Sequence, residues 1–135
     1  DMTMSRSAIY TANTTPTALA VGNIIPVGTM VRRFGKCINQ DGNTITLAGP
    51  GYYLVNASAT VAPTAAGTVS VTGQKDGVAV IGATASATTT AAAESANLSL
   101  DFIVRNVDCG SSILSFALGG AESTVTNLAV TVTKL

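Results

Sequence analysis

The chain has 135 residues, with seven Lys and Arg against seven Asp and Glu and no His, so its formal net charge is zero. Without His there is no imidazole to act as a general base or a metal ligand. Without a surplus of basic residues there is no electrostatic basis for binding nucleic acid or an anionic membrane surface. We therefore expect neither of these partners.

Charged residues make up only 10% of the sequence, and residues 42–74 and 77–93 contain no Asp, Glu, Lys or Arg. Solubility normally depends on mixed surface charges and a net charge away from zero, so a chain this poor in charge should associate with other chains. Its length predicts a single domain. No window holds the run of about 20 apolar residues that a membrane-spanning helix needs.

Alternation of polar and apolar residues with a period of two runs through the chain and is typical of β-strands with one buried face. In chain order, the predicted strands are residues 30–34, 44–47, 52–61, 69–72, 78–81, 98–104, 113–118 and 125–133. Asp41-Gly42 and Asp76-Gly77 are strong hairpin signals because both residue types tolerate positive φ. The pattern predicts an all-β fold, an antiparallel β-sandwich or jelly roll of about eight to ten strands.

Residues 82–97 interrupt this pattern with a low-complexity run of Ala, Thr and Ser. We expect a long loop that crosses the sandwich here, with one helical turn at residues 91–96 as the alternative.

The alternation also assigns side chains to faces. Seven residues are predicted to lie in the core: Tyr53, Val55, Phe102, Leu114, Phe116, Val130 and Val132. Tyr52, Leu54 and Ile103 point to the opposite faces of the same strands and are apolar too. Because the chain is too short to supply a covering helix, another subunit should cover them. Ordinary scatter of apolar surface residues is the alternative. We expect Tyr52, Leu54 and Ile103 at a contact between subunits.

Residues that could carry chemistry are few. Ser and Thr are plentiful, but a nucleophile needs an adjacent base, and no recognisable motif surrounds any lysine. The carboxylates of Asp41 and Asp76 are explained by turns. We expect no catalytic residue, no cofactor and no metal, and hence no enzyme. Cys37 and Cys109 are a poor zinc site without further ligands; free thiols are favoured in a reducing compartment, and a disulfide is the alternative in an oxidising one.

Arg32 and Arg33, with Lys36, form the one basic cluster of the sequence. On an alternating strand the two arginines face opposite ways. One is expected to be solvated and the other to pair with an acid of a neighbouring strand or subunit.

Several short motifs resemble the trimeric TNF-like and complement-type jelly rolls. Residues 48–55 (Ala-Gly-Pro-Gly-Tyr-Tyr-Leu-Val) are similar to a glycine- and tyrosine-containing strand of that superfamily, and residues 75–80 to a later Lys-Asp-Gly turn. The strand–turn–strand at residues 98–118 and the final strand at residues 130–135 follow in the expected order. The resemblance covers roughly residues 25–135 and implies a homotrimer.

Within that superfamily, residues 7–13 and 28–35 resemble small head-fibre or capsid decoration proteins of phages and prophages of Gram-positive bacteria. This implies a structural protein on the virion capsid surface, with residues 1–10 as a leading segment anchored to the major capsid protein and residues 11–135 as the jelly roll. The alternatives are a module of the same fold that binds a host-surface glycan or protein, and the head of a collagen-like glycoprotein on bacterial spores, with an extracellular or spore-surface location.

Overall fold

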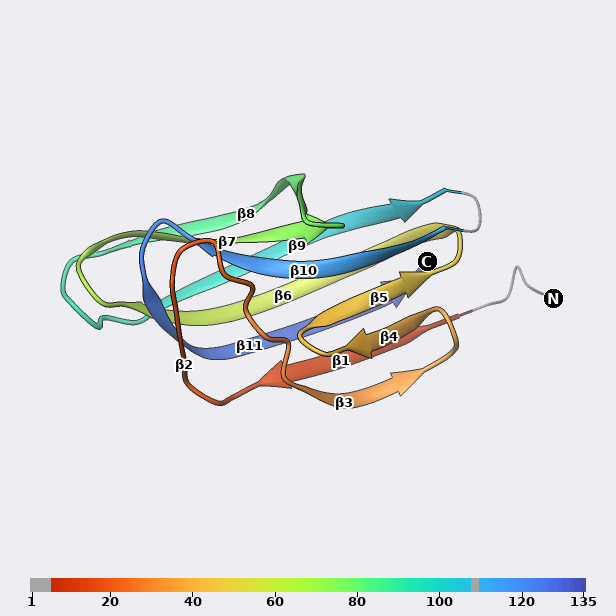
Figure 1. The fold of residues 1–135 in the computed structure, drawn as a ribbon, viewed down its shortest axis with the longest axis horizontal. Coiled ribbons are helices and arrows are strands. Elements are labelled where there is room, and N and C mark those ends of the chain that lie inside the picture. The colour runs from red at the N-terminus through yellow and green to blue at the C-terminus, as the bar shows by residue number, and fades with distance from the viewer. Residues whose placement is uncertain (1–5, 108–109) are drawn as a thin grey trace.

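The computed structural model describes residues 6–107 and 110–135, and its regular secondary structure is β-strand (Figure 1). This confirms the predicted all-β sandwich. The eleven strands are β1 (Ala8–Asn13), β2 (Thr17–Leu19), β3 (Thr29–Phe34), β4 (Ile38–Asp41), β5 (Thr44–Ala48), β6 (Gly51–Pro63), β7 (Gly67–Lys75), β8 (Val78–Thr89), β9 (Ala96–Asn106), β10 (Ser111–Gly119) and β11 (Ser123–Lys134).

The strands form two layers. One sheet has the order β3-β1-β11-β6-β9, with β2 paired to β11 beyond the end of β1, and is called the six-stranded sheet below. The five-stranded sheet has the order β4-β5-β10-β7-β8. Neighbouring strands are antiparallel throughout both sheets. The edge strands β8 and β9 lie along one long side of the molecule, and β3 and β4 along the other (Figure 1).

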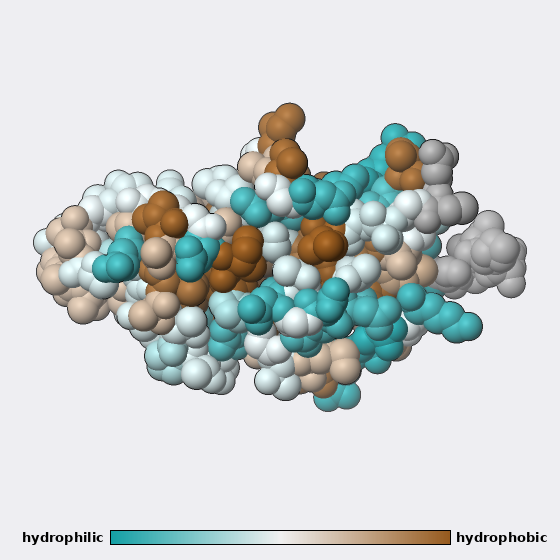
Figure 2. All heavy atoms as spheres, viewed as in Figure 1, coloured by the Kyte–Doolittle hydropathy of each residue, from teal (hydrophilic) through white to brown (hydrophobic). Residues whose placement is uncertain are grey.

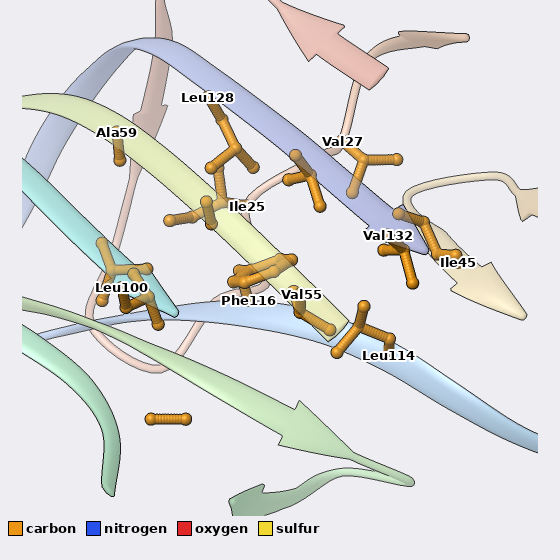
Figure 3. Close-up of a cluster of buried hydrophobic side chains, with 14 of the residues drawn as sticks. Ile25, Val27, Ile45, Val55, Ala59, Leu100, Leu114, Phe116, Leu128 and Val132 are labelled. Atoms are coloured by element: carbon orange, nitrogen blue, oxygen red, sulfur yellow. The ribbon is translucent and has the colours of Figure 1, made fainter. Parts of the chain in front are cut away.

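The core fills the space between the two sheets. Its apolar side chains come from both layers, as Ile45, Leu114 and Phe116 of one sheet and Val55 and Val132 of the other show (Figure 3). Six of the seven predicted core residues are fully buried, and Phe102 is half-buried with its ring edge against Phe116 at a centroid distance of 6.2 Å. The period-two alternation therefore assigned the buried face correctly on β6, β9, β10 and β11.

Residues 82–97 are the main correction. The expected loop is mostly strand, because β8 continues to Thr89 and β9 begins at Ala96. Ala83 is buried and Ala85 and Ala87 are half-buried, while Thr84, Ser86 and Thr88 are exposed. A strand whose inward side chains are only methyl groups alternates correctly but has little hydrophobic contrast, so it resembles low-complexity sequence. The alternative, one helical turn at residues 91–96, is also wrong, since Ala91 to Ser95 make a turn without helix.

Three strands, β1, β2 and β4, carry no strong alternating signal and were not predicted. β1 lies inside the six-stranded sheet, where it pairs with β11 and β3. The expected leading segment, residues 1–10, therefore overlaps the sheet from Ala8 onward. Residues 1–5 lie outside the described residues.

The β7–β8 hairpin confirms one predicted turn. Asp76 and Gly77 both have positive φ, 53° and 79°, as the tight two-residue hairpin turn requires. The Asp76 carboxylate also accepts a hydrogen bond from the Ile113 amide at 2.9 Å, which ties the turn to β10. The predicted turn after Asp41 is likewise present between β4 and β5.

Candidate subunit interface

One large surface is formed by the side chains of the six-stranded sheet that point away from the core, called the outward face below. Residues paired across neighbouring strands lie on the same side of a sheet. The register therefore arranges this face in transverse rows. One row runs Phe34, Ala8, Thr133, Leu54, Ile103, and the next runs Arg32, Tyr10, Thr131, Asn56, Asp101.

The three residues predicted for a subunit contact all lie on this face. Leu54 of β6 is paired directly with Ile103 of β9, and Tyr52 lies two residues from Leu54 on the same side. Tyr52 and Ile103 are 49% and 51% exposed, and Leu54 is half-buried. The guanidinium of Arg105, paired with Tyr52, lies 5.3 Å from the centre of the tyrosine ring. The structure brings these side chains together as one patch.

The part of the outward face that β1 and β3 supply was not predicted from the sequence. Tyr10 and Phe34 are large apolar residues with 41% and 57% of their surface exposed. A hollow of about 140 Å³ lies beside them, with Ala8 and Thr131 among its lining residues and almost no polar surface. The alternation of residues 30–34 was recognised, but their place at the β3 edge depends on pairing with β1, which is not readable locally.

The opposite long side of the sheet also carries apolar groups. A groove of about 280 Å³ between β8 and β9 is lined by Val78, Val80 and Ile103, with Lys75 and Arg105 at its rim. Lys75 Nζ donates a hydrogen bond to the Arg105 carbonyl at 2.7 Å and so joins the end of β7 to the edge strand β9. Ile81, next to this groove in sequence, is completely exposed.

The remainder of the outward face is polar and almost uncharged. Asn56, Ser58 and Thr60 of β6 are paired with Asp101, Ser99 and Asn97 of β9. Apart from Arg105, the charged residues named on the outward face are Arg32 on β3 and Asp101 on β9, and both are exposed.

The outer side of the five-stranded sheet differs in character. It carries hydroxyl pairs between β7 and β8, Thr68 with Thr88 at 3.1 Å and Thr72 with Thr84 at 2.8 Å. In the space-filling view most of the surface has intermediate hydropathy, with separate hydrophobic patches (Figure 2). Hydroxyl pairs satisfy one another and tolerate water, so the part of this surface formed by β7 and β8 threonines does not require a cover.

The charged and titratable groups whose pKa is displaced have structural explanations. Burial, and secondarily the nearby Cys37, raises the pKa of Tyr53 to about 12. Its hydroxyl donates to the carbonyl oxygens of Ala48 and Gly49, each at 2.9 Å, and closes the β5–β6 turn. Hydrogen bonds from Thr90 lower the pKa of Glu94, which caps the β8–β9 turn. Both residues stabilise turns.

Within residues 6–107 and 110–135, no group of three or more potential ligands could hold a metal ion. The same part of the chain contains no helix long and apolar enough to cross a bilayer. Cys37 is half-buried with its Sγ 3.7 Å from Lys134 Nζ. Cys109 lies outside the described residues, so free thiols and a Cys37–Cys109 disulfide both remain alternatives.

The two basic residues of β3 do face opposite ways, as expected. Arg33 is half-buried and its Nε donates to the Ile38 carbonyl at 2.6 Å, so its partner is a backbone oxygen and not an acid of a neighbouring strand. Arg32 projects from the outward face.

No protein-family model matches the sequence, and no curated protein matches it. The fold is nevertheless similar to several solved structures. Murine APRIL at pH 5.0 has a TM-score of 0.72 and 11% identity over 96% of this chain and 99% of that chain. The globular domain of the zebrafish complement 1qA protein has a TM-score of 0.65 and 10% identity over 95% of both chains. The PRD1 vertex protein P5 has a TM-score of 0.61 and 15% identity over 96% of both. These likenesses show a TNF-like jelly roll.

Proposed function

We propose that this chain is a non-enzymatic structural protein that assembles as a homotrimer through the outward face and is displayed on a phage capsid as a head-fibre or decoration protein. The observation that carries the proposal is the outward face itself. Tyr52, Leu54 and Ile103 join Tyr10 and Phe34 in one surface of a chain with few charges to keep it solvated.

Burial of apolar surface stabilises association by about 25 cal/mol per Å² removed from water. Large apolar patches rimmed by polar residues mark interaction sites on soluble proteins. A polar rim is present here. Asn56, Ser58 and Ser99 lie on the same strands as Leu54 and Ile103 and follow the apolar row on the outward face. The number three is taken from the resemblance to the trimeric TNF-like and complement-type jelly rolls, whose fold the chain has.

Display on a capsid is supported by the resemblance of residues 7–13 and 28–35 to phage decoration proteins, and by the shared fold of the PRD1 vertex protein P5. Attachment to the major capsid protein is assigned to the residues that precede β1. Residues 8–10 belong to β1 and pair inside the sheet.

Light scattering on the purified chain tests the assembly. The expected mass is three times 13.5 kDa. Leu54→Asp should yield monomers, because it places a charge in the centre of the apolar row. Ile113→Asp is the matched control: Ile113 is an exposed apolar residue on the five-stranded sheet, and its variant should remain trimeric. A wild-type monomer at micromolar concentration, or equal effects of both substitutions, would refute the proposed interface.

The location is tested separately, by the neighbouring genes and by whether the chain is recovered with purified virions. Capsid and portal genes beside this gene, and recovery of the chain with purified virions, are the expected results. A neighbourhood of spore or glycosyltransferase genes, with no chain in virions, contradicts display on a phage and favours the spore surface.

The alternative function is recognition of a host glycan or protein, for which the loop expected at residues 82–97 would be the binding element. That loop is reduced to Thr90–Ser95, which contains no aromatic side chain to stack on a sugar. Three copies would still gain avidity from weak sites. Binding of the assembled wild-type protein on a glycan array or to host cells would support this alternative, and blank results would exclude it.

A further inference from the structure

We propose that the contact between copies is heterologous, with the β9 edge of one copy against the β3 edge of the next, and that Arg32 of one copy pairs with Asp101 of its neighbour. This inference rests on the assembly described under Proposed function. It adds which edge meets which, and the residues that select that arrangement.

Arg32 and Asp101 lie at opposite ends of one transverse row. The register joins Arg32 to Tyr10, Tyr10 to Thr131, Thr131 to Asn56 and Asn56 to Asp101. Four strand spacings of about 4.8 Å separate the two ends by roughly 19 Å. The two side chains therefore cannot pair within one chain, and each is left exposed at its own edge of the sheet.

Cyclic symmetry makes the shared row significant. A rotation that closes a ring moves nothing along its axis, so groups that meet across a contact lie at the same height along that axis. When the axis runs along the strands, residues of one row share a height. Arg32 and Asp101 satisfy this condition, because the same row contains both.

The neighbouring row supports the same arrangement independently. It runs from Phe34 at the β3 edge to Ile103 at the β9 edge. Both end residues are large, apolar and more than half exposed. A heterologous contact thus brings basic Arg32 to acidic Asp101 in one row. In the next row it brings the apolar side chains of Phe34 and Ile103 together. The groove beside Ile103 and the hollow beside Phe34 lie at the two edges that would meet.

The competing arrangement joins like edges. When the strands of the two copies run parallel, two β9 edges bring two Asp101 carboxylates together, and two β3 edges bring two Arg32 side chains together. Like charges across an interface suppress the wrong partner, and opposite charges fix the register more than they add affinity. The pair Arg32–Asp101 therefore favours a ring over a parallel dimer of like edges.

Charge reversal tests the pairing. Arg32→Asp and Asp101→Arg should each raise the dissociation constant of the trimer by about tenfold or more, because each places like charges at every contact. The double variant restores opposite charges and should return to within about threefold of wild type. Both sites are exposed, and circular dichroism with thermal unfolding confirms that the variants remain folded.

Covalent capture gives a positive readout. In a background with Cys37→Ser and Cys109→Ser, the chain carrying both Arg32→Cys and Asp101→Cys should form disulfide-linked trimers on mild oxidation, while each single variant should not. Linked dimers from a single variant would show that like edges meet, and would overturn the proposal.

The outcomes separate the two proposals. If Leu54→Asp dissociates the trimer but neither charge reversal weakens it and the double-cysteine chain is not linked, the trimer stands and the Arg32–Asp101 contact is wrong. If the wild-type chain is monomeric, the assembly itself fails.

Discussion

Thr11 of β1 is a buried hydroxyl whose Oγ1 has no hydrogen-bond partner among the described residues. It faces the core in a position where the neighbouring strands supply apolar side chains, including Val130 opposite it on β11. An unsatisfied buried hydroxyl costs on the order of 1–3 kcal/mol. Thr11→Val keeps the shape and removes that cost, so we expect it to raise the free energy of unfolding by about 1 kcal/mol.

Denaturant titration measures this change. Thr11→Ser is the control, because it keeps the hydroxyl and removes a methyl group, and it should be less stable than wild type. A valine variant less stable than wild type would mean that the hydroxyl has a partner in solution.

Gly73 of β7 lies directly against the Phe102 ring of β9. A Cβ added at this position would stand 2.4 Å from the ring Cζ, although the backbone of Gly73 needs no positive φ. Gly73→Ala should therefore destabilise the fold by about 1–3 kcal/mol through overpacking. Phe102→Leu should relieve the clash, so the double variant is expected to lose less stability than the sum of the two single ones in a double-mutant cycle. Additive losses would show that Phe102 does not supply the constraint.

At the scale of elements, the β8–β9 turn depends on one carboxylate. Glu94 Oε1 accepts hydrogen bonds from the Thr90 amide at 2.8 Å, the Thr90 hydroxyl at 2.9 Å and the Ala91 amide at 3.1 Å. These bonds favour the ionised form, and the hydrogen bonds from Thr90 chiefly lower the pKa of Glu94. The contribution to stability is therefore complete above the ordinary glutamate pKa and is lost as the pH falls through the lowered value.

Hydrogen exchange of the Thr90 and Ala91 amides follows this turn. Protection is expected at neutral pH and should fall in acid, after correction for the intrinsic rate. Glu94→Gln should lower the protection at neutral pH, with amides inside β6 unchanged. Equal protection in the glutamine variant would show that charge is unimportant for the turn.

Strands rich in Val, Leu and aromatic residues could be predicted from the sequence, because their inward and outward residues differ strongly in hydropathy. β6 is the best case, with Tyr53, Val55 and Val61 inside. β8 could not be predicted at full length because its inward residues are alanines, and β1 because it buries Thr11 and Asn13. The predicted contact residues on β6 and β9 followed from local alternation. The β3 half of the outward face required the pairing of strands far apart in sequence.

For the whole molecule, the scarcity of charge predicts how the assembly responds to salt. The outward face carries apolar and hydroxyl groups, and the proposed contact adds one Arg32–Asp101 pair per copy. Raising NaCl from about 0.05 M to about 1 M screens charges beyond a few ångströms but does not weaken apolar burial. The mass in light scattering should remain that of the trimer across this range. Dissociation at high salt would mean that charges, and not apolar contacts, hold the copies together.

The two ends of the Arg32–Asp101 row also make the parity of the ring measurable. Mixing the Arg32→Asp chain with the Asp101→Arg chain lets opposite charges meet wherever the two variants alternate. An even ring can alternate all the way round, whereas a ring of three always places two copies of the same variant side by side. The mixture should therefore assemble more weakly than the double variant, because one of its three contacts brings like charges together. A mixture as stable as the double variant would reveal an even number of subunits.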